Sequence, residues 1–331
     1  MREVAFDASP GETRAVLFED GAAVELHIHR ANHAATGSIH DAVITAKSAQ
    51  RSFIRLANGE EAMIAAQIAP HEGAAIRVAI NRESIAEPGL QKRAVAALSD
   101  GNISDPAQAA QAWQDALAAR ADRVIPAPKE FDDAFDLASA GVSAIEGGCV
   151  WFERTKAGLI FDVDGTGDVG AINPTAAHEI ARLLRLFQIG GAAITDFVST
   201  ENKAARAHIA AAFDQASAAD DRGFERTSVN GFGLMQVIRA KPRASILDTL
   251  FGTRRAALSD ETCALMLLRE ASRSTGFGAR RCTTTPAIAT LLETEYYRPL
   301  VMAAQRIAGA DVEIVADASV RGYGHIHVNP A

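Results

Sequence analysis

Short runs in which apolar and polar residues alternate dominate the first 82 positions of the chain. Ser9-Pro10-Gly11 separates the first two runs, and Asp20-Gly21 before the third is a strong hairpin signal. The alternation predicts strands over residues 3–6, 14–18, 24–28, 42–45, 52–56, 62–68 and 75–80. Because several short strands at this spacing are typical of small closed sheets, the second half of this region predicts a small barrel.

The pattern changes after residue 82. Proline and glycine interrupt residues 83–130, and an Ala/Gln-rich stretch over 107–121 predicts a helix within them. Residues 131–146 are also expected to be helical. We therefore expect residues 83–130 to form a helical connector between two better defined parts of the chain.

A strand, a helix and a second strand are predicted in the segment that follows. The strands cover residues 158–163 and 192–196, which are short and mostly apolar. Between them, Asn173 is a good N-cap, Pro174 suits the first helical position, and apolar residues at helical spacing continue to Phe187. A strand, helix and strand of this length form a right-handed crossover between parallel strands.

The composition and length are those of a globular protein of about two domains. Of the 331 residues, 48% are hydrophobic and 22% charged, no apolar run reaches the ~20 residues of a membrane span, and no signal-peptide core follows Met1. The three cysteines lie too far apart for a zinc ribbon or a disulfide scaffold; they are Cys149, Cys263 and Cys282. We therefore expect a cytoplasmic protein without a membrane partner.

The charge is unevenly distributed along the chain. The net charge is −8, but residues 100–168 carry thirteen acidic and five basic residues, whereas residues 239–281 carry nine basic and four acidic ones. An acidic centre beside a basic region suits a metal site next to a polyanion. Ordinary surface variation is the alternative explanation.

Three carboxylates are expected to meet at one edge of the predicted parallel sheet. Asp162 and Asp164 alternate with apolar residues and point to one side of the first strand, while Asp196 closes the second strand. Open α/β sheets bind ligands at the carboxyl ends of their strands, and oxygen-only ligands select Mg²⁺ or Mn²⁺. The alternative is a solvated turn at the end of the first strand and a helix cap at Asp196.

Two other motifs compete for these residues. Residues 159–166 look like the first motif of haloacid-dehalogenase-type phosphatases, in which Asp162 would be the nucleophile and Asp164 the general acid/base. That family usually opens with this motif, whereas about 160 residues precede it here, and Asp220-Asp221 does not follow a hydrophobic strand. A calcium EF-hand fails because its twelfth position is Asn173 rather than glutamate.

A longer match involves the helix and the second strand. Residues 173–191 read NPTAAHEIARLLRLFQIGG, and residues 196–198 read DFV. This resembles the catalytic core of the ribonuclease E/G family, whose pattern is N-x-x-A-A-x-E-I-A-R-x-L-R-L-x-x-I-G-G before a hydrophobic strand ending D-F-I. FGL at 232–234 with RAK at 239–241 resembles the family's R-F-G-L-x-E-M-x-R-x-R segment, and FDVD at 161–164 resembles its I-D-[IV]-N metal motif.

The resemblance implies an α/β (α+β) fold, with a β-rich N-terminal part that includes a small OB-type barrel, a mixed α/β catalytic domain and a small C-terminal α/β domain. We accordingly divide the chain into N-terminal strands that pack on the core (1–37), an OB-type RNA-binding barrel (38–82), a helical connector (83–130), a metal-dependent catalytic domain (131–243) and a small C-terminal domain (244–331).

The function implied by the resemblance is a compact Mg²⁺-dependent endoribonuclease, with Mn²⁺ as a possible substitute, that cleaves single-stranded RNA in RNA processing or decay. Asp162 and Asp196 would be catalytic and would hold the ion with Asp164, so that the ion polarises the scissile phosphate.

The RNA-binding residues would be Lys47, Phe53, Arg55, Arg239, Lys241 and Arg243. Phe53 could equally belong to the barrel core, and the basic residues could serve only solubility. The rival function is a non-catalytic RNA-binding member of the same family.

Several departures from the family pattern affect the metal site. Asp164 stands in place of the usual asparagine, which keeps an oxygen ligand and adds a negative charge. The loop over residues 165–172 is shorter than usual and carries Gly167-Asp168 where the family tends to have lysine or arginine, and Gln236 replaces a common glutamate. These changes are the reason for keeping the non-catalytic alternative.

Two features of the family are expected to be missing. The stretch 244–258 contains no cysteine, so we expect no zinc and no zinc-linked oligomer. Residues 83–130 are too few for a complete sensor of the RNA 5′ end, and Gly223 stands where its arginine would be, with Arg222 one residue away. We therefore expect no discrimination between 5′ phosphorylation states.

Overall fold

The computed structural model describes residues 1–166, 168–200 and 202–329. Its N-terminal sheet has the order β11-β1-β2-β3 and consists of β1 (Arg2–Ser9), β2 (Glu12–Glu19), β3 (Ala22–Arg30) and β11 (Arg123–Ile125). Asp20 and Gly21 both have positive φ in the tight turn between β2 and β3. This is the geometry that a two-residue hairpin requires, so the hairpin predicted from Asp20-Gly21 is confirmed.

A closed five-stranded barrel follows, which confirms the predicted small barrel. Its strands are β4 (Ile39–Lys47), β5 (Ser52–Leu56), β6 (Glu61–Ile64), β7 (Ala75–Arg82) and β10 (Ala94–Leu98), in the order β10-β6-β5-β4-β7. Alternate side chains such as Ile44, Ile54 and Val78 fill the interior. The barrel therefore has a core of its own, as five short strands need to be stable.

The barrel extends beyond the predicted boundary at residue 82. The predicted helical connector contains the hairpin of β8 (Ile85–Glu87) and β9 (Leu90–Lys92), then β10, and only afterwards α1 (Pro106–Ala118). Ala94 and Ala96 are buried on β10, where small side chains face the barrel interior. Because alanine favours helices locally, only the pairing of β10 with β6 and β7 makes this segment a strand.

A second boundary also differs from the prediction. Residues 131–146 were expected to be helical, but α2 (Glu130–Ala140) ends at Gly141, which is in the left-handed conformation. Residues beyond it form β12 (Val142–Ile145), paired with the next strand. Glycine at this position ends a helix because it adopts positive φ without a steric cost.

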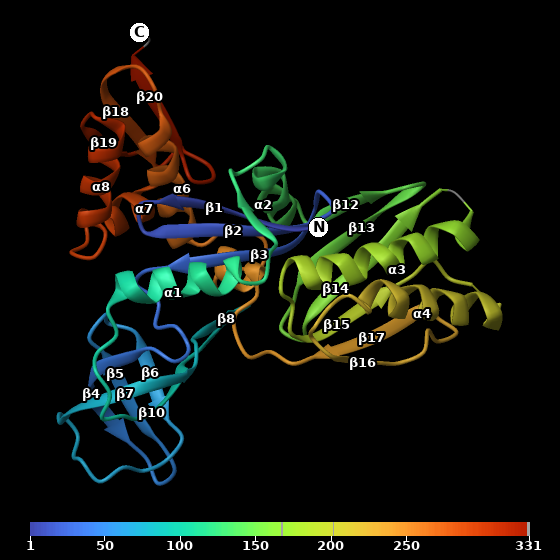
Figure 1. The fold of residues 1–331 in the computed structure, drawn as a ribbon, viewed down its shortest axis with the longest axis horizontal. Helices are drawn as coiled ribbons and strands as arrows, with labels where there is room; N and C mark the ends of the chain where they lie inside the picture. Colours follow the sequence, from blue (N-terminus) through green and yellow to red (C-terminus); the bar gives the residue numbers. More distant parts are fainter. Residues whose placement is uncertain (167, 201, 330–331) are drawn as a thin grey trace.

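The α/β unit is built on a six-stranded sheet, with the order β12-β13-β14-β15-β17-β16. Its further strands are β13 (Gly148–Arg154), β14 (Leu159–Gly165), β15 (Gly191–Asp196), β16 (Phe224–Arg226) and β17 (Leu234–Arg239). β14 and β15 are parallel, as predicted, and the other pairs are antiparallel. Helices α3 (Val169–Leu186) and α4 (Lys203–Ser217) lie together on one face of the sheet (Figure 1).

The start of α3 differs from the prediction. Asp168, not Asn173, is the N-cap, and its carboxylate accepts a hydrogen bond from the Gly170 backbone N–H. Pro174 lies inside the helix, and Asn173 is buried with its side chain bonded to the backbone of Val198. The Asn-Pro pair resembles a helix start locally, but its asparagine has a partner 25 residues away.

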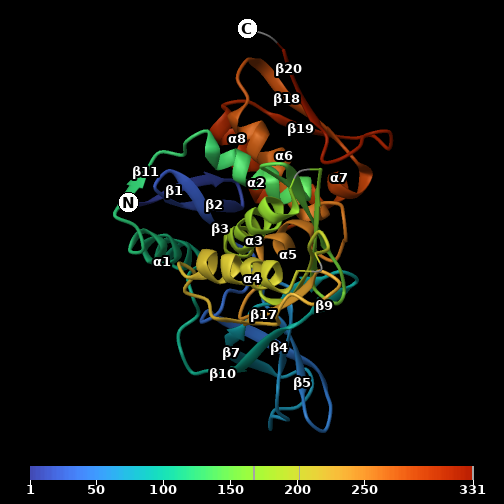
Figure 2. The same ribbon diagram turned by 90° about the vertical axis from the view of Figure 1, so that its right-hand side faces the viewer.

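The C-terminal part contains a three-stranded sheet with the order β19-β18-β20. The elements from residue 246 onward are α5 (Ile246–Phe251), α6 (Asp260–Arg273), β18 (Phe277–Thr284), α7 (Pro286–Leu292), α8 (Arg298–Ala308), β19 (Val312–Ala316) and β20 (His325–Asn329). This domain and the barrel lie at opposite ends of the molecule, with the N-terminal sheet between them and the α/β unit to one side of that sheet (Figures 1 and 2).

The observed architecture confirms the predicted α/β (α+β) class with a β-rich N-terminal part. A buried ion cluster joins that part to the C-terminal domain: Arg30 bonds Glu12 on β2 and Glu261 on α6. Within the described ranges, no helix has the length and apolarity needed to span a membrane.

Candidate active site

The parallel register of β14 and β15 places Asp162 directly opposite Asp196. Neighbouring strands are about 4.8 Å apart, and residues opposite each other in a parallel pair project from the same face. Leu159, Phe161 and Val163 are buried beneath the helices, whereas both aspartates are exposed. The two carboxylates therefore share the face of the sheet that α3 and α4 leave open.

Asp164 lies on β14, two residues beyond Asp162. It is exposed on the same face and is paired with Cys149 on β13. In the part of the chain that the structure describes, no three His, Cys, Asp or Glu side chains are close enough to hold a metal ion. Two of the three predicted ligands are thus brought together as neighbours, and Asp164 does not complete a triad in this conformation.

The donor set of the pair nevertheless fits a hard divalent cation. Mg²⁺ is commonly bound through one or two carboxylates, with water and substrate phosphates as its other ligands. Asp162 and Asp196 are such carboxylates, exposed to solvent where a phosphate could approach. In the loop that follows β14, Gly167 lies outside the described residues, and Asp168 caps α3.

The end of β15 is held by two further contacts. The Phe197 backbone N–H donates to the Gly233 carbonyl at 3.1 Å, and the Asn173 side chain bonds the backbone of Val198. A side chain at Gly233 would place its Cβ 2.5 Å from the Phe197 carbonyl oxygen, and Gly233 has a φ of +89°. Only glycine fits there, so Gly233 and Asn173 are positioning residues for Asp196 that the sequence analysis missed.

Two exposed aromatic residues lie beside the acidic pair. Trp151 on β13 is opposite Asp162 and 49% exposed, and Leu234 on β17 is opposite Asp196. Phe232, two residues before Leu234, is 81% exposed. The sequence analysis missed the position of Trp151, although its alternation with buried Val150 and Phe152 signals an outward-facing residue.

The turn that carries Phe232 is well ordered by hydrogen bonds. The side-chain oxygen of Asn230 accepts from the backbone N–H groups of Phe232 at 2.9 Å and Leu234 at 3.0 Å. The Asn230 backbone N–H also donates to the Leu234 carbonyl at 3.0 Å. A large aromatic side chain is therefore held in solvent on a tight turn next to Asp196.

Of the three RNA-binding residues predicted on the barrel, Lys47 and Phe53 contact other parts of the barrel, and Arg55 is exposed to solvent. The Lys47 ammonium donates to the carbonyls of Ile68 and Pro70. Phe53 is half-buried, and the Arg93 guanidinium lies 5.2 Å from the centre of its ring. Arg55 is exposed on the same strand.

The other three predicted RNA-binding residues lie at the opposite end of the sheet from the aspartates. Arg239 pairs with Gly191 at the start of β15 and is buried, and its guanidinium donates to the Leu184 carbonyl at 2.7 Å and to Asp220. Lys241 is half-buried. Arg243 is exposed and donates to the Gln188 side chain at 3.1 Å.

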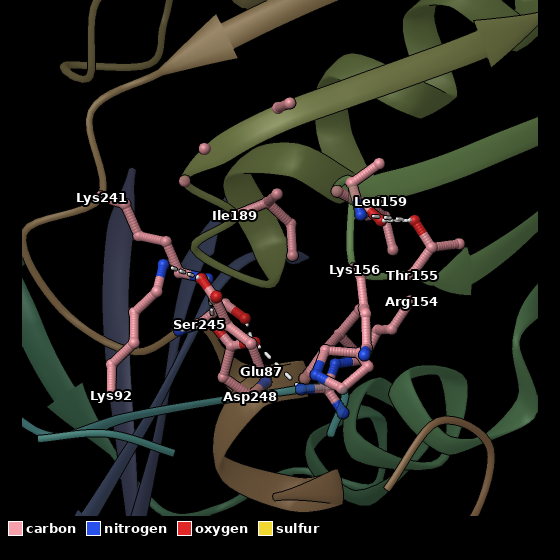
Figure 3. A pocket seen from close by; sticks show the side chains of 17 residues that line it. Glu87, Lys92, Arg154, Thr155, Lys156, Leu159, Ile189, Lys241, Ser245 and Asp248 are labelled. Atoms are coloured by element: carbon pink, nitrogen blue, oxygen red, sulfur yellow. Dashed lines mark hydrogen bonds and ion pairs between the residues drawn. The ribbon is translucent and has the colours of Figure 1, made fainter. Parts of the chain in front are cut away.

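A cavity of about 340 Å³ opens at this end of the sheet, next to Gly158 and Gly191. Figure 3 shows Lys92, Lys156 and Lys241 around it, together with Glu87 and Asp248. Lys241 forms ion pairs with both carboxylates, at 3.2 and 3.0 Å, and Lys92 pairs with Glu87 at 2.7 Å. Lys156 has no carboxylate partner within the described ranges. With buried Arg154, four basic side chains and two carboxylates line the cavity, so positive charge exceeds negative charge here.

These features define the chain as an α/β protein with an acidic pair at the carboxyl ends of two parallel strands, attached to a five-stranded barrel. Residues 132–242 match the model of the Ribonuclease E/G family. The predicted resemblance to this family is thus confirmed over residues 132–242.

Curated relatives support the same assignment over part of the chain. It is 31% identical over 137 residues to "Ribonuclease G" of Escherichia coli strain K12, and the match covers 36% of this chain and 27% of the relative. The values are the same for "Ribonuclease G" of Shigella flexneri. The chain thus spans little more than a quarter of the length of these relatives.

Proposed function

We propose that this protein is a Mg²⁺-dependent endoribonuclease that cleaves single-stranded RNA at the Asp162–Asp196 pair. The observation that supports this most directly is the register of β14 and β15, which puts two exposed carboxylates side by side. Both lie within the segment that matches the Ribonuclease E/G family.

The carboxylates of Asp162 and Asp196 would hold the ion, Mg²⁺ or Mn²⁺, with Asp164 close enough along β14 to act on the same substrate. When bound, a divalent ion supplies charge stabilisation at the scissile phosphate and lowers the pKa of an attacking water. Asn173 and Gly233 keep Asp196 at the position opposite Asp162. The chain's own contribution is therefore a preformed pair of oxygen donors on an open surface.

Basic groups at the other end of the sheet would contact the RNA backbone. Lys156 and Lys241 line the cavity beside Gly191, and Arg243 is exposed near it. On the barrel, Phe53 and Arg55 would offer one stacking surface and one charge. Arg239 is buried, so we assign it to holding the sheet against α3 rather than to direct RNA contact.

A non-catalytic RNA-binding protein of the same family is the second candidate. It is favoured by Asp164, which stands where the family pattern has asparagine and adds a third negative charge to this face. An assay with RNA of mixed sequence, with and without Mg²⁺, separates the two candidates. Binding without any metal-dependent cleavage would reject the nuclease.

The proposed location is the cytoplasm, where RNA substrates occur. The three cysteines are free thiols in the structure, which suits a reducing compartment. The proposed partner is single-stranded RNA, and we expect no zinc-linked oligomer because no paired cysteines are available to bind zinc.

A further inference from the structure

The open face of the six-stranded sheet carries aromatic side chains on both sides of its acidic pair. One row across the sheet contains Trp151, Asp162, Asp196 and Leu234, in that order, on four neighbouring strands. Phe232 projects from the turn that leads into Leu234. Trp151 and the Phe232 turn therefore flank the two carboxylates.

Folding alone does not account for these two side chains. Trp151 is 49% and Phe232 81% exposed, although a buried aromatic side chain would contribute ~1.5–3 kcal/mol to stability. The backbone of the turn at Phe232 is moreover fixed by the hydrogen bonds that the Asn230 side chain accepts. Exposed aromatic groups beside a polar site are typical of ligand contacts.

The spacing of the row fits a ligand with more than one ring. With strands about 4.8 Å apart, three strand spacings put Trp151 about 14 Å from Leu234, and the carboxylates lie in the middle. An extended strand of nucleic acid carries bases on both sides of each phosphate. A phosphate at the acidic pair would thus have one base near Trp151 and another near Phe232.

We propose that Trp151 and Phe232 stack on RNA bases on the two sides of the scissile phosphate and so hold that phosphate at Asp162 and Asp196. The inference rests on the proposed function and deepens it by naming residues that select single-stranded substrates. In a duplex both faces of each base are already stacked, so these side chains have no free base to bind. Stacking works with any base, so the site discriminates by strandedness more than by sequence.

Tryptophan fluorescence tests the stacking directly. The chain contains two tryptophans. Trp113, which packs against Phe6 and His29, can be replaced by phenylalanine. In Trp113→Phe, an unstructured RNA of about ten nucleotides, a length within the usual single-strand site size, should quench Trp151 emission. The titration uses Ca²⁺ in place of Mg²⁺, and electrophoresis afterwards verifies that the RNA is intact.

Affinity measurements on variants complete the test. Trp151→Ala and Phe232→Ala should each weaken binding of the same RNA, now carrying a terminal label, roughly tenfold or more, whereas Trp151→Phe should restore most of the affinity. The matched control is Ile238→Ala, a residue 54% exposed on the same face but opposite Ala192, away from the carboxylates. It should change the affinity less than twofold.

The outcomes separate this inference from the proposed function. Metal-dependent cleavage with no quenching and unchanged affinity in both alanine variants would overturn the stacking while leaving the nuclease intact. Quenching and weakened variants without any cleavage would support the stacking and reject the nuclease. Trp151 emission that shifts with protein concentration before RNA is added would overturn the inference, because a second copy of the chain would then cover this face.

Discussion

The side-chain amide of Asn173 holds the backbone of Val198 through two hydrogen bonds. Its Nδ2 donates to the Val198 carbonyl at 2.7 Å, and its Oδ1 accepts from the Val198 N–H at 3.1 Å. Val198 is two residues beyond Asp196, so a residue inside α3 fixes the segment that directs one of the two carboxylates.

Replacement of Asn173 by alanine should therefore affect both stability and cleavage. It leaves two backbone groups without their partner, at a cost of ~1–3 kcal/mol, and frees the end of β15. We expect a lower unfolding midpoint and a cleavage rate reduced about tenfold or more with little change in RNA affinity. Thr175→Ala, which removes only a bond within α3, is the control. Unchanged cleavage by Asn173→Ala would show that Asp196 needs no such support.

Asp162→Asn and Asp196→Asn should each abolish metal-dependent cleavage while the fold is retained. Each removes one of two anionic groups, and the loss of transition-state charge stabilisation should lower the rate at least ~100-fold. Cleavage is measured with Mg²⁺ and with EDTA, and circular dichroism verifies folding. Asp168→Asn is a matched control, because asparagine can keep the α3 cap. Equal cleavage by all variants in EDTA would refute the catalytic role.

The buried Glu12 carboxylate should make folding stability depend on acidic pH. Burial raises the pKa of Glu12, but the guanidinium groups of Arg30, Arg14 and Arg269 outweigh it and lower the pKa from 4.5 to about 2. The stabilisation is therefore present above pH 4.5 and is lost as the pH falls toward 2. Its size is on the order of 3 kcal/mol.

Urea unfolding between pH 7 and pH 3 measures this effect. Glu12→Gln should be less stable than the wild type at pH 7, because it leaves buried arginines without their partner, and its stability should fall less on acidification. Glu61→Gln removes an exposed ion pair with Arg93 and should follow the wild-type profile. Parallel profiles for the wild type and Glu12→Gln would contradict the linkage.

Purified protein should contain no structural zinc. Cys263 and Cys282 are buried in the C-terminal core, and Cys149 lies on β13, so the three thiols are dispersed over the fold. Elemental analysis should give no stoichiometric zinc, and a chelator should not change the oligomeric state. About one zinc per two chains, with dissociation on chelation, would overturn this prediction.

Cleavage should not depend on the phosphorylation state of the RNA 5′ end. Arg222, one residue from the expected sensor position, already donates to the backbone carbonyl and side chain of Gln188. The connector is occupied by β8, β9, β10 and α1. The same RNA with a 5′ monophosphate or a 5′ hydroxyl should be cut at equal rates. A tenfold preference for the monophosphate, about 1.4 kcal/mol, would reveal a sensor.

Local patterns in the sequence were sufficient for the hairpin at Asp20-Gly21 and for the parallel strands of the α/β unit. Alternation along residues 159–165 placed Asp162 and Asp164 on one face, since side-chain direction in a strand follows from position alone. The family resemblance likewise depended on residues close together in the chain, and the match over 132–242 confirmed it.

Tertiary structure alone decided the remaining features. Pairing with β6 and β7 makes the alanine-rich β10 a strand, Val198 keeps Asn173 inside a helix, and the register across four strands brings Trp151 and the turn of Phe232 to the acidic pair. The same applies to Arg239, whose basic side chain is buried against Leu184 and Asp220 instead of facing solvent. In each case the interacting residue is distant in sequence. Buried polar groups and the backbone groups of a strand must be hydrogen-bonded, and only the folded chain determines which residues are close enough to form those bonds.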